Sequence, residues 1–115
     1  MSWTLKVRDS FSAAHFLRGY KGKCEKVHGH TFRVEVEVRV SELDATGIGL
    51  DFTELRKALA SILPDHALLN EVYPFNPSAE NLARQFFGEL KGRYPVRAVT
   101  VWESEDASAT YTEDD

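Results

Sequence analysis

Residues 32–40, FRVEVEVRV, alternate apolar and charged side chains without a break, and this alternation limits the possible folds more than any other stretch. Successive side chains of a β-strand point to opposite faces, so the segment predicts a strand with one buried and one exposed face. Strands of this kind belong to antiparallel sheets that are covered on one side. Residues 3–15 show the same two-residue period, and we expect them to pair with residues 30–40.

A helix is expected next, over residues 52–63, where apolar side chains recur at helical spacing. Asp51 and Glu54 form a capping box at its start, and Pro64 should end it.

A second helix and two further strands complete the expected fold. The helix should begin after Pro77 with Ser78 as its N-cap and stop before Gly92, and strands should follow at residues 96–103 and 107–112. The order ββααββ predicts an α+β fold, with a four-stranded antiparallel sheet and two helices on one of its faces.

Length and composition narrow the class of protein. With 115 residues, 43% of them hydrophobic, the chain is expected to form a single domain over 1–115 with its own core. Because 18 acidic side chains outnumber 14 basic ones, nucleic acid is not an expected partner. The sequence has neither a secretory apolar segment at its start nor an apolar run long enough to span a bilayer, so we expect no membrane partner and a cytoplasmic location.

Three histidines are expected to converge. His28 and His30 lie two residues apart on an extended segment and therefore point to the same side, and Gly29 between them adds no bulk. Antiparallel pairing brings His15, at the end of the first strand, beside them. Three imidazoles are the ligand set of a catalytic zinc with an open fourth position. The alternative is that these are surface or structurally bonded histidines.

Cys24 is the only cysteine of the chain and cannot form an internal disulfide. It could complete a closed structural zinc site, be a buried structural residue, or act as an acid or base near the metal. Lys21, Lys23 and Lys26 in the same loop would favour its thiolate form; the alternative is that they only form a solvated loop.

Two further candidate functional sites in the sequence contain an acidic residue. Asp65 and His66 are neighbours after the first helix, as in a proton-transfer pair, although a histidine at a helix C-terminus that interacts with the dipole is the plainer interpretation. Glu103 shares the alternation of Val99 and Val101 and is expected to point inward at the end of its strand. It would there form a trapped salt bridge or accept hydrogen bonds from a ligand.

Six separated segments together resemble one known family: FSAAHFL, CEKVHGHTFRVEVEV, GIGLDFTELRKAL, PDHALLNE, NPSAENLA and VTVWES. In this order they are similar to the 6-pyruvoyl-tetrahydropterin synthase family, and within it to the 6-carboxy-tetrahydropterin synthase (QueD) branch of queuosine biosynthesis. The resemblance implies the tunnelling fold (T-fold), in which ββααββ subunits form a trimeric barrel and two trimers stack into a homohexamer.

The resemblance also implies roles for individual residues. Zinc would be held by His15, His28 and His30, with Cys24 as the catalytic base. The catalytic pair Asp65 and His66 would reach the pocket from a neighbouring subunit, Glu103 would bind the pterin's pyrimidine edge, and Ser78 and Glu80 would line the pterin pocket.

The activity that the resemblance implies is a zinc-dependent lyase reaction. It converts 7,8-dihydroneopterin triphosphate into 6-carboxy-5,6,7,8-tetrahydropterin, acetaldehyde and triphosphate. The three residues between Cys24 and His28 favour this branch, because eukaryotic pyruvoyl-forming synthases usually have five. The alternatives are a 6-pyruvoyl-tetrahydropterin synthase, a related side-chain-cleaving enzyme, and a non-catalytic pterin-binding zinc protein.

Overall fold

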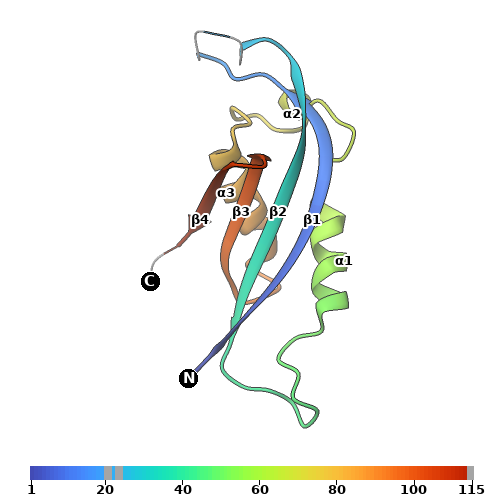
Figure 1. Cartoon of the computed structure of the whole chain (residues 1–115), viewed down its shortest axis with the longest axis vertical. Helices are drawn as coiled ribbons and strands as arrows, with labels where there is room; N and C mark the ends of the chain where they lie inside the picture. The colour runs from blue at the N-terminus through green and yellow to red at the C-terminus, as the bar shows by residue number, and fades with distance from the viewer. Residues whose placement is uncertain (20–21, 23–24, 114–115) are drawn as a thin grey trace.

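The computed structural model describes residues 1–19, 22 and 25–113 as one four-stranded sheet with helices against it. The elements follow in the order β1 (Trp3–His15), β2 (His28–Val40), α1 (Phe52–Ile62), α2 (Leu69–Val72), α3 (Ala79–Leu90), β3 (Val96–Ser104) and β4 (Ala107–Thr112). The sheet has the order β1-β2-β3-β4, and every neighbouring pair is antiparallel. Helices α1 and α3 lie on the same side of it (Figure 1). The predicted sheet and its covering helices are therefore confirmed.

The long β1–β2 hairpin carries the alternation seen in the sequence. Phe32, Val34 and Val36 of β2 are fully buried on the covered face, as predicted. Pairing begins earlier in β2 than the alternation indicates, because His15 lies opposite His28 at the end of the hairpin where the connecting segment joins the two strands. The residues at this end are polar, so the apolar alternation does not predict that the strands extend this far. The backbone pairing nevertheless continues through them.

The two long helices supply the other half of the core. Residues at helical spacing are fully buried on α3, among them Leu82, Phe86 and Leu90, and the helix contacts β3 and β4. Burying a phenylalanine or leucine side chain contributes roughly 1.5–3 kcal/mol. Helix α1 lies against β1. Asp51 caps α1 by accepting a hydrogen bond from the Thr53 N–H at 2.8 Å.

Three details of the fold differ from the sequence prediction. Helix α2 was not predicted, because four residues are too few to show a helical period. Phe52 and Trp3 fall in the apolar patterns of their elements, but their exposed fractions are 46% and 42%. Both line the same open groove between the start of β1 and the start of α1, so neither is covered by a neighbouring element.

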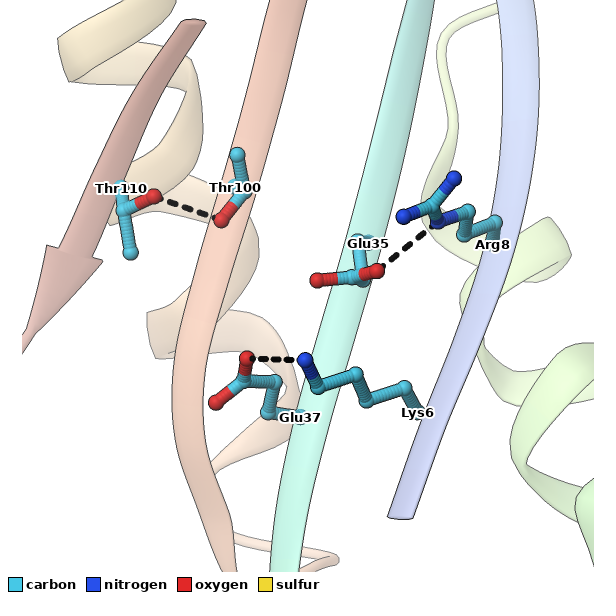
Figure 2. Close-up of polar contacts among 6 residues, drawn as sticks. All are labelled: Lys6, Arg8, Glu35, Glu37, Thr100 and Thr110. Carbon is cyan, nitrogen blue, oxygen red and sulfur yellow. Dashed lines mark hydrogen bonds and ion pairs between the residues drawn. The ribbon is translucent and has the colours of Figure 1, made fainter. Parts of the chain in front are cut away.

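The opposite face of the sheet has a row of polar side chains. Three cross-strand pairs lie on it (Figure 2): Lys6–Glu37 at 3.3 Å, Arg8–Glu35 at 2.8 Å and Thr100–Thr110 at 2.6 Å. An ion pair with both partners accessible to solvent, such as Lys6–Glu37, contributes at most about 1 kcal/mol, and in the Arg8–Glu35 pair only Arg8 is exposed. The covered face, rather than this row, therefore provides most of the stability of the sheet.

Among the residues that the structure describes, no helix has both the length and the apolar character needed to cross a membrane.

Candidate metal centre

Three histidines meet at the end of the β1–β2 hairpin. His15 lies opposite His28, and His30 lies opposite Ala13, so all three side chains point to the covered face. Their ring centroids are 4.6 to 5.1 Å apart. This confirms that pairing of the two strands brings the imidazoles together. The arrangement follows from the register alone, because residues directly opposite and residues two apart share a face.

Backbone carbonyls fix how two of the rings are presented. His15 Nδ1 lies 2.8 Å from the carbonyl oxygen of Pro77, and His28 Nδ1 lies 2.7 Å from that of Lys26. A carbonyl oxygen can only accept, so Nδ1 carries the proton in both rings. The Nε2 atoms are then left with free lone pairs. Metal-binding histidines are held by this same kind of outer contact.

Two imidazole nitrogens of the cluster lack hydrogen-bond partners. His15 Nε2 and His30 Nε2 are both buried without a hydrogen bond. His30 Nε2 lies 3.1 Å from Glu103 Oε1, but the two atoms do not form a hydrogen bond. Leaving a buried polar atom unpaired costs about 1–3 kcal/mol. A cation among these atoms would remove that cost, so the residues present fit a metal ion.

Burial also keeps the imidazoles in the form that binds metals. Desolvation lowers the pKa of His15 and outweighs the opposing influence of the Pro77 carbonyl and the Glu103 carboxylate. Desolvation likewise lowers the pKa of His30, against the attraction of Glu103. Both rings therefore favour the neutral state, which is the state that coordinates a cation.

Glu103 belongs to the same group of donor atoms. One oxygen of its carboxylate and one nitrogen of each of the three imidazoles all lie within 4.8 Å of one another. Glu103 points inward as predicted, and the register of β3 and β4 shifts between Trp102 and Ser104, which is how a bulge redirects a side chain. Sequence reasoning gave this carboxylate a role with a ligand and missed its place beside the histidines. The pairing of Val101 with Val34 would have shown it.

The Asp65–His66 pair is attached to the outer edge of β1. His66 Nδ1 donates to Asp65 Oδ2 at 2.7 Å, and Asp65 Oδ1 accepts from the Ser12 N–H at 2.9 Å. His66 also has a left-handed backbone with φ of 58°, and its N–H donates to the Ser12 carbonyl. Its ring bonds to the carboxylate rather than to the last carbonyls of α1, which favours the proton-transfer interpretation over the helix-dipole one.

The imidazole of His66 faces solvent. Its side chain is 83% exposed, and it is not part of the group formed by the three clustered histidines and Glu103. A strained, hydrogen-bonded and exposed acid–base pair is unusual where no function requires it. Its ring is therefore free to contact something outside the described chain.

The pH dependence of stability should reveal the Asp65 contacts. The Ser12 N–H, followed by the His66 side chain, lowers the pKa of Asp65 below 3.8. A carboxyl with a lowered folded-state pKa adds stability above its unfolded value and loses it as pH falls through the folded value. In the metal-free protein, Asp65→Asn should therefore lower the unfolding temperature near neutral pH, and the difference should shrink below pH 3.8. A difference that stays constant with pH would show that the carboxylate contributes nothing through its charge.

The remaining predicted site residues are Ser78 and Glu80 at the start of α3, and Cys24. Ser78 caps α3, with its hydroxyl oxygen 3.2 Å from the Asn81 nitrogen, as the sequence predicts. Glu80 is exposed in the first turn of α3. Neither position tests the predicted contact with a pterin. Cys24 lies outside the described residues, as do Lys21 and Lys23.

Fold and site together define a small α+β protein with a cluster of side chains that could hold a metal ion at one end of its sheet. Residues 4–114 match the family described as 6-pyruvoyl tetrahydropterin synthase, and the chain belongs to this family. Members of the family are enzymes that act on pterins and form oligomers.

Three individual relatives carry two different activities in their names. An Archaeoglobus fulgidus protein, provisionally named 6-carboxy-5,6,7,8-tetrahydropterin synthase, is 42% identical over 103 residues, which cover 87% of each chain. A Synechocystis sp. 6-carboxy-5,6,7,8-tetrahydropterin synthase is 33% identical over 119 residues, 95% of this chain and 92% of that one. A Pyrococcus furiosus dihydroneopterin monophosphate aldolase is 32% identical over 105 residues, 86% of this chain and 88% of that one.

A solved structure agrees with the fold. The 6-pyruvoyl tetrahydropterin synthase of Caenorhabditis elegans superposes with a TM-score of 0.87 at 30% identity, covering 99% of this chain and 97% of that one. The subunit therefore has the tunnelling fold that the sequence resemblance implied.

Proposed function

We propose that the protein is a 6-carboxy-5,6,7,8-tetrahydropterin synthase. Its substrates would be 7,8-dihydroneopterin triphosphate and one water molecule, and its products 6-carboxytetrahydropterin, acetaldehyde and triphosphate. The observation that carries this proposal is the cluster of three imidazoles, two of which have a buried and unpaired Nε2 atom, in a member of this family. The names of the relatives from Archaeoglobus and Synechocystis supply the carboxy-forming branch.

The metal would be zinc, held by His15, His28 and His30. Neutral imidazoles suit zinc well, and three of them leave a coordination position for a ligand. Zinc bound there would supply Lewis acidity toward the side-chain hydroxyls of the pterin. The Pro77 and Lys26 carbonyls would keep two of the rings in the ligating tautomer.

The remaining steps fall to residues of the chain itself. Cys24, as thiolate, would remove a proton from the first side-chain carbon of the substrate. His66, oriented by Asp65, would move protons at the next carbons. Glu103 lies beside His30 and would accept hydrogen bonds from the pyrimidine edge of the pterin, which orients the ring without taking part in bond breaking. Ser78 and Glu80 would line the far side of the pterin pocket.

The complete active site would require more than one subunit. The exposed His66 ring and its separation from the histidine cluster support the proposal that the Asp65–His66 pair serves a neighbouring copy of the chain. The outer edge of β4 and the part of the β1 edge that precedes Ser12 would pair in a trimeric barrel, since strand edges with free backbone groups invite such pairing. Two such trimers would form the homohexamer.

Two other reactions compete within the same fold. The pyruvoyl-forming reaction is named in the C. elegans structure, and side-chain cleavage by an aldolase is named in the P. furiosus relative. Both would use the metal and an acid–base set on a related pterin. A pterin-binding zinc protein without catalysis would need neither Cys24 nor the Asp65–His66 pair.

Product analysis separates these possibilities. The zinc-loaded protein is incubated with 7,8-dihydroneopterin triphosphate without oxygen, and the products are identified by mass. We expect carboxytetrahydropterin with acetaldehyde in equal amounts. A pyruvoyl pterin, or a hydroxymethyl pterin with a two-carbon aldehyde, would assign the chain to one of the competing reactions. Unchanged substrate that stays bound would remove the catalytic proposal.

A further inference from the structure

Alternate residues along the outer edge of β1 all bond to one stretch of chain near the candidate metal centre. Ser12 bonds to Asp65 and His66 through its own N–H and carbonyl. Ala14 comes next: its N–H donates to the Ala67 carbonyl at 2.9 Å. A strand presents backbone groups to the same edge at every second residue, so this stretch takes the place of a neighbouring strand.

Two asparagine side chains continue the pattern beyond the end of β1. Asn70 accepts from the Phe16 N–H at 2.9 Å and donates to the Phe16 carbonyl at 3.0 Å. Asn76 does the same for Arg18, at 2.9 and 3.2 Å. A primary amide offers a donor and an acceptor side by side, as a peptide group does. Each asparagine therefore acts as one residue of a missing partner strand.

Asn76 is also connected to the metal cluster through its neighbour. The next residue, Pro77, provides the carbonyl that accepts from His15 Nδ1. The carbonyl of Asn76 itself accepts from the Asn81 side chain at 2.9 Å and from the Ser78 N–H at 2.8 Å. The Asn76 contacts thus join three parts: the chain after β1, the start of α3, and the outer contact of His15.

We propose that Asn70 and Asn76 are positioning residues of the metal centre. His15 lies between Ala14 and Phe16, and both of these are held by the 65–76 stretch. The two amides fix the path of the chain past His15 and keep the Pro77 carbonyl where it holds the ring. Losing either amide lets this end of β1 shift relative to β2, which spoils the convergence of the three Nε2 atoms. The inference rests on the proposed metal-dependent function, but it concerns metal geometry and not the reaction.

Amide-to-acid variants test this inference with little change in shape. Asn76→Asp and Asn70→Asp keep an acceptor for the backbone N–H but place an oxygen against the Arg18 or Phe16 carbonyl. The matched control is Gln85→Glu on α3, which adds the same charge by the same chemical change. The probe is Co²⁺, whose visible absorption reports coordination geometry, with affinity measured against a competing chelator.

We expect each aspartate variant to weaken Co²⁺ binding about 10-fold or more, as loss of outer contacts to metal ligands does. The visible band should change in intensity or position, while Gln85→Glu matches wild type. Folded variants with wild-type affinity and spectrum would overturn the inference. If the aspartate variants do not fold, Asn70→Ser removes one amide without adding charge. Its Co²⁺ affinity and visible spectrum then test the inference in the same way. A wild-type chain that binds no Co²⁺ would overturn it as well.

The outcome is independent of catalysis. A wild-type protein that binds Co²⁺ but does not convert 7,8-dihydroneopterin triphosphate would refute the proposed reaction, while the variant comparison would still be valid. Wild-type turnover together with unchanged metal binding in both asparagine variants would refute the positioning role alone.

Discussion

His28→Ala should abolish both metal binding and turnover. The substitution removes one of the three imidazoles proposed to hold the metal, whose rings lie within about 5 Å of one another, and it leaves only two imidazoles beside the Glu103 carboxylate. We expect metal affinity to fall at least about 100-fold, since even outer contacts are worth 10–100-fold. Turnover should fall about 10³-fold or more, because a bound metal lowers the barrier by several kcal/mol. Metal content and initial rates on the same preparation measure both effects.

His66→Ala is the matched control for this result. It also removes an imidazole, but one that is exposed and outside the cluster. This variant should keep its full complement of metal and lose only turnover. His28 is only partly buried, so its replacement should leave the fold intact, which circular dichroism can verify. Full metal content in His28→Ala would show that the cluster is not the binding site.

Mixing two inactive variants should restore activity. Cys24→Ala lacks the proposed base, and His66→Ala lacks the proton-transfer pair, so each alone should be inactive. If the Asp65–His66 pair completes the pocket of a neighbouring subunit, hybrid oligomers will contain some pockets in which both parts are intact. With random assembly at equal amounts, about a quarter of the pockets carry both, and about a quarter of wild-type activity should return. Co-expression of the two variants with different tags, followed by tandem purification, yields the hybrids to be assayed.

A second mixture serves as the control for this experiment. Cys24→Ala with His28→Ala should recover nothing, because both residues are assigned to the same subunit's part of the pocket. No recovery in the Cys24→Ala and His66→Ala mixture would mean that the pair acts within its own chain, and the exposed His66 ring would then need another explanation.

The histidine cluster was accessible from sequence because two simple periodicities determine it. His28 and His30 share a face at a spacing of two residues, and antiparallel pairing places His15 opposite His28. The fold was accessible for the same reason: strict alternation in β2 and helical spacing in α3 each specify one element. Local patterns of this kind suffice where the contacts follow from regular backbone geometry.

Features that depend on irregular backbone were not accessible. The left-handed conformation of His66 carries no sequence signal of its own, and neither does the shift of register beside Glu103. The paired bonds from Asn70 to Phe16 span 54 residues along the chain. Asparagine before proline indicates a turn, and nothing in that pattern shows which distant backbone its side chain will meet. The exposure of Phe52 was not accessible either, because it depends on whether another part of the fold packs over the side chain.

The register of the β1–β2 hairpin determines whether the three histidines can come together at all. A slip of β1 by one residue against β2 would move His15 to the polar face of the sheet, opposite to His28 and His30. Only the native pairing and slips by an even number of residues keep the rings on a common face, and only the native pairing places His15 directly opposite His28. A ligand that binds one arrangement stabilises it by mass action over the others. Metal supply during synthesis would thus influence the yield of correctly paired chains, apart from any role in turnover.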